Sequence, residues 1–159
     1  MYSFASDEYI EQLVKTHSNS MLKAAFALLR NRDDAEDIVQ EAFMKLMEKK
    51  PRFNDDEHAK AWLLRVTINL SKNMLKASSR KNKSETEEIS YTENESDGVL
   101  FCVMKLEENY RTVIHLYYYE GYSIKEIAAI LKLPSATVGT RLKRGRSKLK
   151  KMLEGDVSI

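Results

Sequence analysis

The stretch from Ser78 to Gly98 reads SSRKNKSETEEISYTENESDG and contains almost no large apolar side chains. A segment of this composition cannot bury enough apolar surface to offset the conformational entropy lost on folding. No single hydrophobic core can therefore run through the middle of this 159-residue chain. We predict two small domains, at residues 5–78 and 99–155, joined by a flexible acidic linker at residues 79–98.

Helical periodicity on both sides of the linker predicts an all-α protein. The chain has two prolines and five glycines, and no segment shows the alternation of a half-buried strand. The apolar spacing predicts helices at Asp7–Leu29, Arg32–Lys49 and His58–Ala77, and a second helical block that opens at Val99. The third of these helices is expected to bury Ala59, Leu63, Val66, Leu70, Met74 and Ala77 on one side.

The sequence predicts a cytoplasmic protein with no segment inserted in a membrane. No apolar run approaches the roughly 20 residues that cross a bilayer. Asp7, Glu8 and Glu11 fall where a signal peptide needs its apolar stretch. Cys102 is the only cysteine, so neither an internal disulfide nor a thiolate zinc site can form within one chain. We expect no cofactor and no metal ion.

Opposite charges are segregated along the chain, although the net charge is only +2. Between Ser135 and Gly155 there are seven basic residues and one acid, Glu154. Residues 84–97 contain six acids and no base. This asymmetry indicates a nucleic-acid contact near the C-terminus, preceded by a solvated linker.

The residues from Gly121 to Pro134 carry the signals of a short helix between two turns. Ser123 is followed three residues later by Glu126, an arrangement in which each side chain satisfies a backbone amide at a helix start. The segment Lys132-Leu133-Pro134 ends that helix, and Ser135 is expected to cap the next one. Two short helices joined so tightly predict a helix-turn-helix, whose second helix can lie in the DNA major groove. The apolar face of the first helix consists of Ile124, Ile127, Ala128 and Leu131.

The helix that follows Ser135 shows two neighbouring stripes at 100° per residue. The apolar stripe is expected to point inward and consists of Val138, Leu142, Gly145, Leu149, Met152 and Leu153. The polar stripe consists of Thr137, Arg141, Arg144, Lys148 and Lys151. Guanidinium groups suit phosphate oxygens and the paired acceptors of guanine, and lysines attract phosphates. A run of charged residues usually forms only a solvent-exposed helix face. This stripe, however, lies where a helix-turn-helix presents residues to DNA.

Two blocks of the sequence resemble the extracytoplasmic-function (ECF) sigma factors of bacterial RNA polymerase. The first block comprises DDAEDIVQEAF at 33–43 and AWLLRVTINL at 61–70. The second comprises YRTVIHLYYYEGYSIKEIAAIL at 110–131 and TVGTRLKRGRSKL at 137–149. The order of the blocks and the acidic linker between them are also similar to the family. The resemblance implies an alternative sigma factor that binds core polymerase and directs promoter recognition and strand opening, not an enzyme.

The resemblance assigns a role to each domain. The N-terminal domain would dock on the polymerase clamp and handle the minus-10 element, and the C-terminal domain would read the minus-35 element and contact the flap. Glu107 stands where the family commonly has proline, Gly139 where lysine is frequent and Gly145 where alanine is. Gly139 therefore lacks a phosphate contact. The residues expected to bind minus-35 DNA are Ser135, Thr137, Thr140, Arg141, Arg144 and Lys148.

The second predicted helix carries an acidic outer face beside its apolar one. Acids near a helix start are also favourable on an ordinary solvated surface. DAEDIVQEAF matches the clamp-binding signature of the family, and the resemblance therefore assigns Asp37, Gln40 and Glu41 to polymerase contact.

The third predicted helix carries aromatic, amide and basic groups on one outer face. Such groups suit single-stranded DNA, because bases stack on rings, amides read base edges and cations hold phosphates. A tryptophan alone is more often a core residue. The loop Pro51–His58 corresponds to the family's pocket for an extruded minus-10 base, with Arg52, Phe53 and Asn54 as candidate readers. The residues expected at the minus-10 element are Trp62, Arg65, Asn69, Lys72, Asn73 and Lys76.

Two other functions compete with this reading. A stand-alone helix-turn-helix repressor or activator would bind its DNA without polymerase. A metal hydrolase would use His17, His58 and His115, but these residues have no HExxH-like spacing, and the chain has no phosphate loop or nucleophile elbow.

The resemblance also suggests a binding partner besides polymerase and DNA. Many members of the family have a membrane-anchored anti-sigma factor, which is therefore a further candidate partner.

Overall fold

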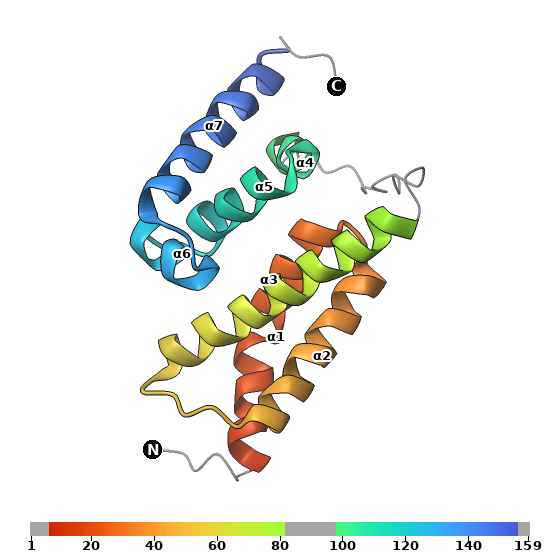
Figure 1. Cartoon of the computed structure of the whole chain (residues 1–159), viewed down its shortest axis with the longest axis vertical. Coiled ribbons are helices and arrows are strands. Elements are labelled where there is room, and N and C mark those ends of the chain that lie inside the picture. Colours follow the sequence, from red (N-terminus) through yellow and green to blue (C-terminus); the bar gives the residue numbers. More distant parts are fainter. Residues whose placement is uncertain (1–6, 82–97, 156–159) are drawn as a thin grey trace. The chain divides into compact units, whose positions relative to one another are not determined.

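The computed structural model describes residues 7–81 and 98–155, which form two compact helical units (Figure 1). Unit 1 contains the described residues 7–81 and unit 2 the described residues 98–155. The predicted all-α class and the two helical domains are confirmed, with no strand in the described ranges. Most of the predicted linker, residues 82–97, lies outside the described residues.

Unit 1 is a bundle of three helices, in which each helix packs on the other two. They are α1 (Asp7–Leu29), α2 (Arg32–Lys49) and α3 (Asp56–Lys81). The bounds of α1 and α2 agree with the prediction, and Asn31 begins α2 by accepting a 3.0 Å hydrogen bond from the Asp34 amide. The largest fully buried side chains of the bundle are Met21, Leu28, Ile38, Leu46, Leu63, Leu64 and Ile68.

The buried face of α3 differs from the predicted one. Ala77 is exposed and Val66 only half-buried, whereas Thr67 and Ser71 are fully buried. Because α3 packs on both other helices, its buried face is wider than a single apolar stripe. The two hydroxyls tolerate burial because each donates to the carbonyl four residues earlier, Thr67 to Leu63 at 2.7 Å and Ser71 to Thr67 at 2.8 Å.

Unit 2 packs four shorter segments around one long helix. Its elements are α4 (Gly98–Lys105), α5 (Glu108–Ile114), the π-helical turn η2 (His115–Tyr119), α6 (Ile124–Leu131) and α7 (Ser135–Leu153). The helix α7 contacts α4, α5 and α6. The core contains Met104, Ile114, Leu116, Ile127 and Leu142. The buried guanidinium of Arg111 donates to the Leu106 carbonyl at 2.6 Å, which satisfies this carbonyl at the α4–α5 corner.

Gly145 allows α5 and α7 to approach closely. A Cβ at this position would lie 3.2 Å from Cγ1 of Ile114 and 3.4 Å from Cβ of Tyr110. A contact of 3.2 Å is tighter than most real Cβ contacts, so the neighbouring side chain would have to move. The glycine that the sequence places on the inward stripe is therefore explained by helix packing.

The helix-turn-helix formed by α6 and α7 is confirmed, and its first cap agrees with the prediction. Ser123 and Glu126 form the reciprocal capping box, with hydrogen bonds of 3.0 and 3.1 Å. In the first bond the Ser123 amide donates to the Glu126 carboxylate, and in the second the Glu126 amide donates to the Ser123 hydroxyl oxygen. Hydrogen bonding to the carboxyl, first from the Ser123 amide and then from the Ser123 side chain, lowers the pKa of Glu126. Lys132 ends α6 in the left-handed region, with φ of 54°.

The second cap differs from the prediction. Pro134, not Ser135, is the N-cap of α7, and no side-chain cap hydrogen bond forms. The Pro134 backbone is extended, and its carbonyl accepts from the amides of Thr137 and Val138, so the helix begins one residue earlier than a Ser135 cap would require.

Candidate nucleic-acid interface

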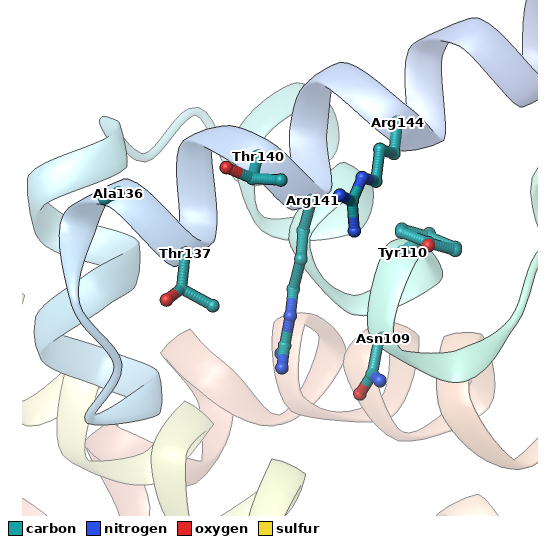
Figure 2. Close-up of a pocket in the computed structure, with 7 residues that line it drawn as sticks. All are labelled: Asn109, Tyr110, Ala136, Thr137, Thr140, Arg141 and Arg144. Atoms are coloured by element: carbon teal, nitrogen blue, oxygen red, sulfur yellow. The ribbon is translucent and has the colours of Figure 1, made fainter.

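An open pocket of about 440 Å³ lies between α7 and α5. The residues that line it are Asn109, Tyr110, Ala136, Thr137, Thr140, Arg141 and Arg144. Figure 2 shows Arg141 and Arg144 projecting from adjacent turns of α7 on the side where Asn109 and Tyr110 of α5 lie. The pocket therefore combines two guanidinium groups with hydroxyl and amide groups, which are the groups that bind phosphates and base edges.

Four of the six residues expected at minus-35 DNA meet in this pocket: Thr137, Thr140, Arg141 and Arg144. Ser135 is exposed at the start of α7 and is not part of the pocket lining. Nothing lies within 4 Å of a Cβ built at Gly139, so this position faces open space without a side chain.

Lys148 lies one turn beyond Arg144 and contacts the start of α5. Its Nζ is 3.0 Å from Oε1 of Glu107 and 4.9 Å from the centre of the Tyr110 ring. The side chains of Lys148 and Glu107 are 44% and 70% exposed, so this ion pair is at the surface. The sequence pattern did not indicate the pair, which joins residues 41 positions apart.

Sequence reasoning missed Asn109 and Tyr110 as pocket residues. Both follow two acidic residues at the start of a seven-residue helix, where no basic pattern marks a DNA contact. Only the packing of α5 against α7 brings them beside Arg141 and Arg144.

An apolar groove of about 470 Å³ lies on another part of unit 2. It is formed mainly by side chains of α4, η2 and α7, and its lining includes Val99, Val103, Tyr118, Tyr119, Leu149 and Leu153. Leu153 was expected to be buried, but it is 54% exposed because α7 ends there, beyond the helices that cover its earlier turns.

The outer face of α2 in unit 1 is acidic and exposed. Asp37, Gln40 and Glu41 are all exposed, and they follow the spacing of neighbours on one helix face. Met44 continues this face and is 62% exposed, which is high for a large apolar side chain.

The outer face of α3 carries the residues expected at minus-10 DNA. Asn69, Asn73 and Lys76 are exposed, whereas Trp62, Arg65 and Lys72 are half-buried. The Trp62 ring lies 5.8 Å from the ring of Phe53, so it packs against the loop that precedes α3 while keeping part of its surface open.

A smaller cavity, of about 210 Å³, lies where this loop meets α1. Phe53 and Asn54 line it, together with Tyr9, Gln12, Leu13, Asp55 and Asp56. The buried ring of His17 is 2.9 Å from Oδ1 of Asp56 and so ties α1 to the start of α3. Burial, and then the negative charge of Asp56, raise the pKa of the Tyr9 hydroxyl. Arg52, the third candidate reader, is exposed and outside the cavity lining.

The described residues contain no group of three or more His, Cys, Asp or Glu side chains that could hold a metal ion. None of the helices in residues 7–81 and 98–155 is long and apolar enough to span a bilayer.

Comparison with known proteins assigns each unit to a family. Residues 13–81 match the model of sigma-70 region 2, and residues 97–149 match that of sigma-70 region 4. The ECF RNA polymerase sigma factor SigW of Bacillus subtilis is 31% identical, with alignment over 89% of this chain and 87% of SigW. This chain belongs to the ECF sigma factors. The ECF sigma-E factor of Escherichia coli K12 is 33% identical, over 71% of this chain and 70% of its own length.

Solved structures show the same fold. The structure of CnrH, determined in complex with the cytosolic domain of CnrY, matches with a TM-score of 0.72 and 27% identity, covering 96% of this chain and 92% of CnrH. RpoE of Bartonella quintana, bound to the anti-sigma factor NepR, matches with a TM-score of 0.78 and 24% identity, over 92% and 98% of the two chains. This ECF sigma factor is thus an alternative sigma factor of RNA polymerase, and the stand-alone regulator is not favoured.

Proposed function

We propose that this sigma factor uses the pocket between α7 and α5 to hold minus-35 duplex DNA. The supporting observation is the convergence of Arg141 and Arg144 on a surface that also carries Thr137 and Thr140. Arginine forks can bind both the DNA backbone and guanine edges in the major groove, and hydroxyls add phosphate contacts. Ser135 and Lys148 flank this surface and would contact the backbone on either side of it.

Unit 1 would bind the polymerase and the opened strand on two different helices. Asp37, Gln40 and Glu41 on α2 form an exposed acidic face suited to docking on the polymerase clamp. Single-stranded minus-10 DNA would lie along α3, on Trp62, Arg65, Asn69, Lys72, Asn73 and Lys76. A flipped base would enter the cavity beside Phe53 and Asn54.

Binding energy alone would drive strand opening in this scheme. The chain would dock on core polymerase, hold duplex DNA upstream and capture the separated strand downstream, so that melting is favoured without nucleotide hydrolysis by this chain. The protein would act in the cytoplasm and would not itself be an enzyme. The apolar groove of α4, η2 and α7 would seat the polymerase flap, and a membrane-anchored anti-sigma factor would compete for such surfaces.

Run-off transcription with purified bacterial core polymerase on a genomic fragment library tests the proposal and finds the promoters. Replacing Arg141 and Arg144 with alanine should lower specific transcripts about tenfold or more, while competition for core polymerase stays unchanged. Lys143→Ala is the control, because it removes an exposed charge of α7 outside both the pocket and the apolar groove. If the double variant lost core binding equally, the assignment of α7 to DNA would be wrong.

Asn69→Ala tests the melting role of α3. We expect it to slow open-complex formation, followed by permanganate reactivity of unpaired thymines, more than it weakens initial promoter binding. The exposed side chain should leave unit 1 folded after truncation. Unchanged melting of a duplex promoter would remove Asn69 from the proposed site.

A further inference from the structure

The basic residues of α7 at and beside the pocket, which we call the α7 surface, are Arg141, Arg144 and Lys148. They differ in whether a carboxylate already pairs with them. In the described part of the chain, Arg141 and Arg144 pair with no carboxylate, whereas Lys148 is held by Glu107 at 3.0 Å. The Lys148 ammonium also lies 4.9 Å from the centre of the Tyr110 ring, within the range of a cation–π contact. Tyr110 lines the same pocket as the two arginines, so this pair stands at the pocket's edge.

The carboxylate of Glu107 makes no hydrogen bond at the start of the helix that it precedes. Glu107 is the N-cap of α5, but its side chain makes no cap hydrogen bond there. Its backbone carbonyl, which accepts from the amides of Tyr110 and Arg111, supports the helix start instead. Removing the charge of Glu107 should therefore free Lys148 while leaving the hydrogen bonds that begin α5 in place.

We propose that Glu107 is a negative determinant of DNA affinity: it holds Lys148 against Tyr110 and competes with the DNA backbone for this one positive charge. This inference rests on the proposed function of the α7 surface. A lysine contributes to duplex binding by displacing a counterion from a phosphate, and an ammonium already neutralised by a carboxylate contributes less. An exposed ion pair is weak enough for a phosphate to compete with it.

The test uses the full chain and a fluorescein-labelled, mixed-sequence DNA duplex of about 25 base pairs, because phosphate contacts are independent of sequence. Fluorescence anisotropy gives the dissociation constant between about 50 and 200 mM salt. Glu107→Gln should tighten binding about two- to fivefold at the low end of this range. It should also steepen the plot of log K against log salt by up to about 0.9, the value for one phosphate contact.

A double-mutant cycle with Lys148→Met identifies the cause. If Glu107 acts through Lys148, Glu107→Gln has no effect in the Lys148→Met background. An equal gain in both backgrounds would mean that Glu107 merely repels DNA, and would overturn the inference. No gain in the wild-type background would overturn it too. Glu154→Gln makes the same charge change on an exposed residue at the end of α7 and should tighten binding less than Glu107→Gln.

The Arg141→Ala, Arg144→Ala double variant separates this inference from the proposed function. If the double variant bound the duplex as tightly as the wild type, the α7 surface would not be the DNA site and the proposed function would fail. If the double variant lost binding while the cycle gave no coupling, only the role of Glu107 would fail.

Discussion

Unit 1 and unit 2 stabilise helical domains by different means. The helices of unit 1 have 23, 18 and 26 residues and pack on one another pairwise around a shared core. In unit 2, α4, α5 and α6 have only eight, seven and eight residues. Helices so short are marginal on their own. Unit 2 therefore depends more on caps, on a buried arginine and on a glycine contact, and we expect it to be more sensitive to small polar changes.

The largest effect should come from emptying the core of unit 1. Leu63 is fully buried, and Leu63→Ala should lower the free energy of unfolding by about 3 kcal/mol. Trp62 is the only tryptophan, so its fluorescence during urea unfolding reports on unit 1. Leu142→Ala is the matched change in unit 2, where Leu142 is equally buried. A shift of the tryptophan transition by Leu142→Ala as large as that by Leu63→Ala would show that the units unfold together.

A smaller effect should distinguish the caps of the two units. Ser123→Ala and Asn31→Ala each remove a side-chain cap, a change that costs about 1 kcal/mol. The consequence should be greater in unit 2, because α6 has eight residues and α2 has 18. Amide hydrogen exchange should rise throughout α6 in Ser123→Ala, but only in the first turn of α2 in Asn31→Ala. An equal spread of faster amide exchange in α6 and in α2 would contradict the expectation that unit 2 depends more on its caps.

A gain of stability is expected at Gly139. Nothing lies within 4 Å of a Cβ at this position, so Gly139→Ala should add about 0.5–1 kcal/mol through helix propensity. Gly145→Ala has the same propensity gain but meets Ile114 at 3.2 Å, so its net benefit should be smaller. Thermal unfolding followed by circular dichroism compares the two variants. A larger gain at Gly145 would mean that α5 and α7 adjust without cost.

The smallest effect should be a pH dependence of the α6 cap. Hydrogen bonds from Ser123 lower the pKa of Glu126 in the folded chain. A group with a lowered pKa stabilises the fold above its ordinary pKa, and this contribution is lost as the pH falls through the lowered value. The stability difference between wild type and Glu126→Gln should therefore narrow as the pH falls below the ordinary Glu range. Urea unfolding midpoints measured at several pH values give this stability difference. A difference that widens on acidification would refute the lowered pKa of Glu126.

The sequence predicted much of the fold because its local signals agree with the packing. Asn31 marks the start of α2, and the capping box of Ser123 and Glu126 marks that of α6. The ends of α3 were predicted too short, because residues 56–57 and 78–81 are mostly polar and carry no apolar period. The burial of Thr67 and Ser71 could not be predicted from polarity, since their hydroxyls are satisfied within α3 itself.

The candidate site was predictable only where one helix supplies it. The helical spacing of α7 predicts that Arg141 and Arg144 share one face, and both line the pocket. Asn109 and Tyr110 come from α5, and the pairing of Lys148 with Glu107 joins α7 to the residue before α5. Such contacts depend on how two helices pack, which no pattern within a single helix encodes.

Because Gly145 has no side chain, the contact at this position sets how closely the two walls of the proposed DNA pocket approach. The two walls of the pocket are α7 and α5, and the distance between these helices is limited by the fit of residue 145 against Ile114 and Tyr110. A graded series from alanine to serine to valine would push the walls apart in small steps while leaving Arg141, Arg144 and Asn109 unchanged. A buried position could thereby adjust the width of the binding surface, and affinity could evolve without any change in the residues that touch DNA.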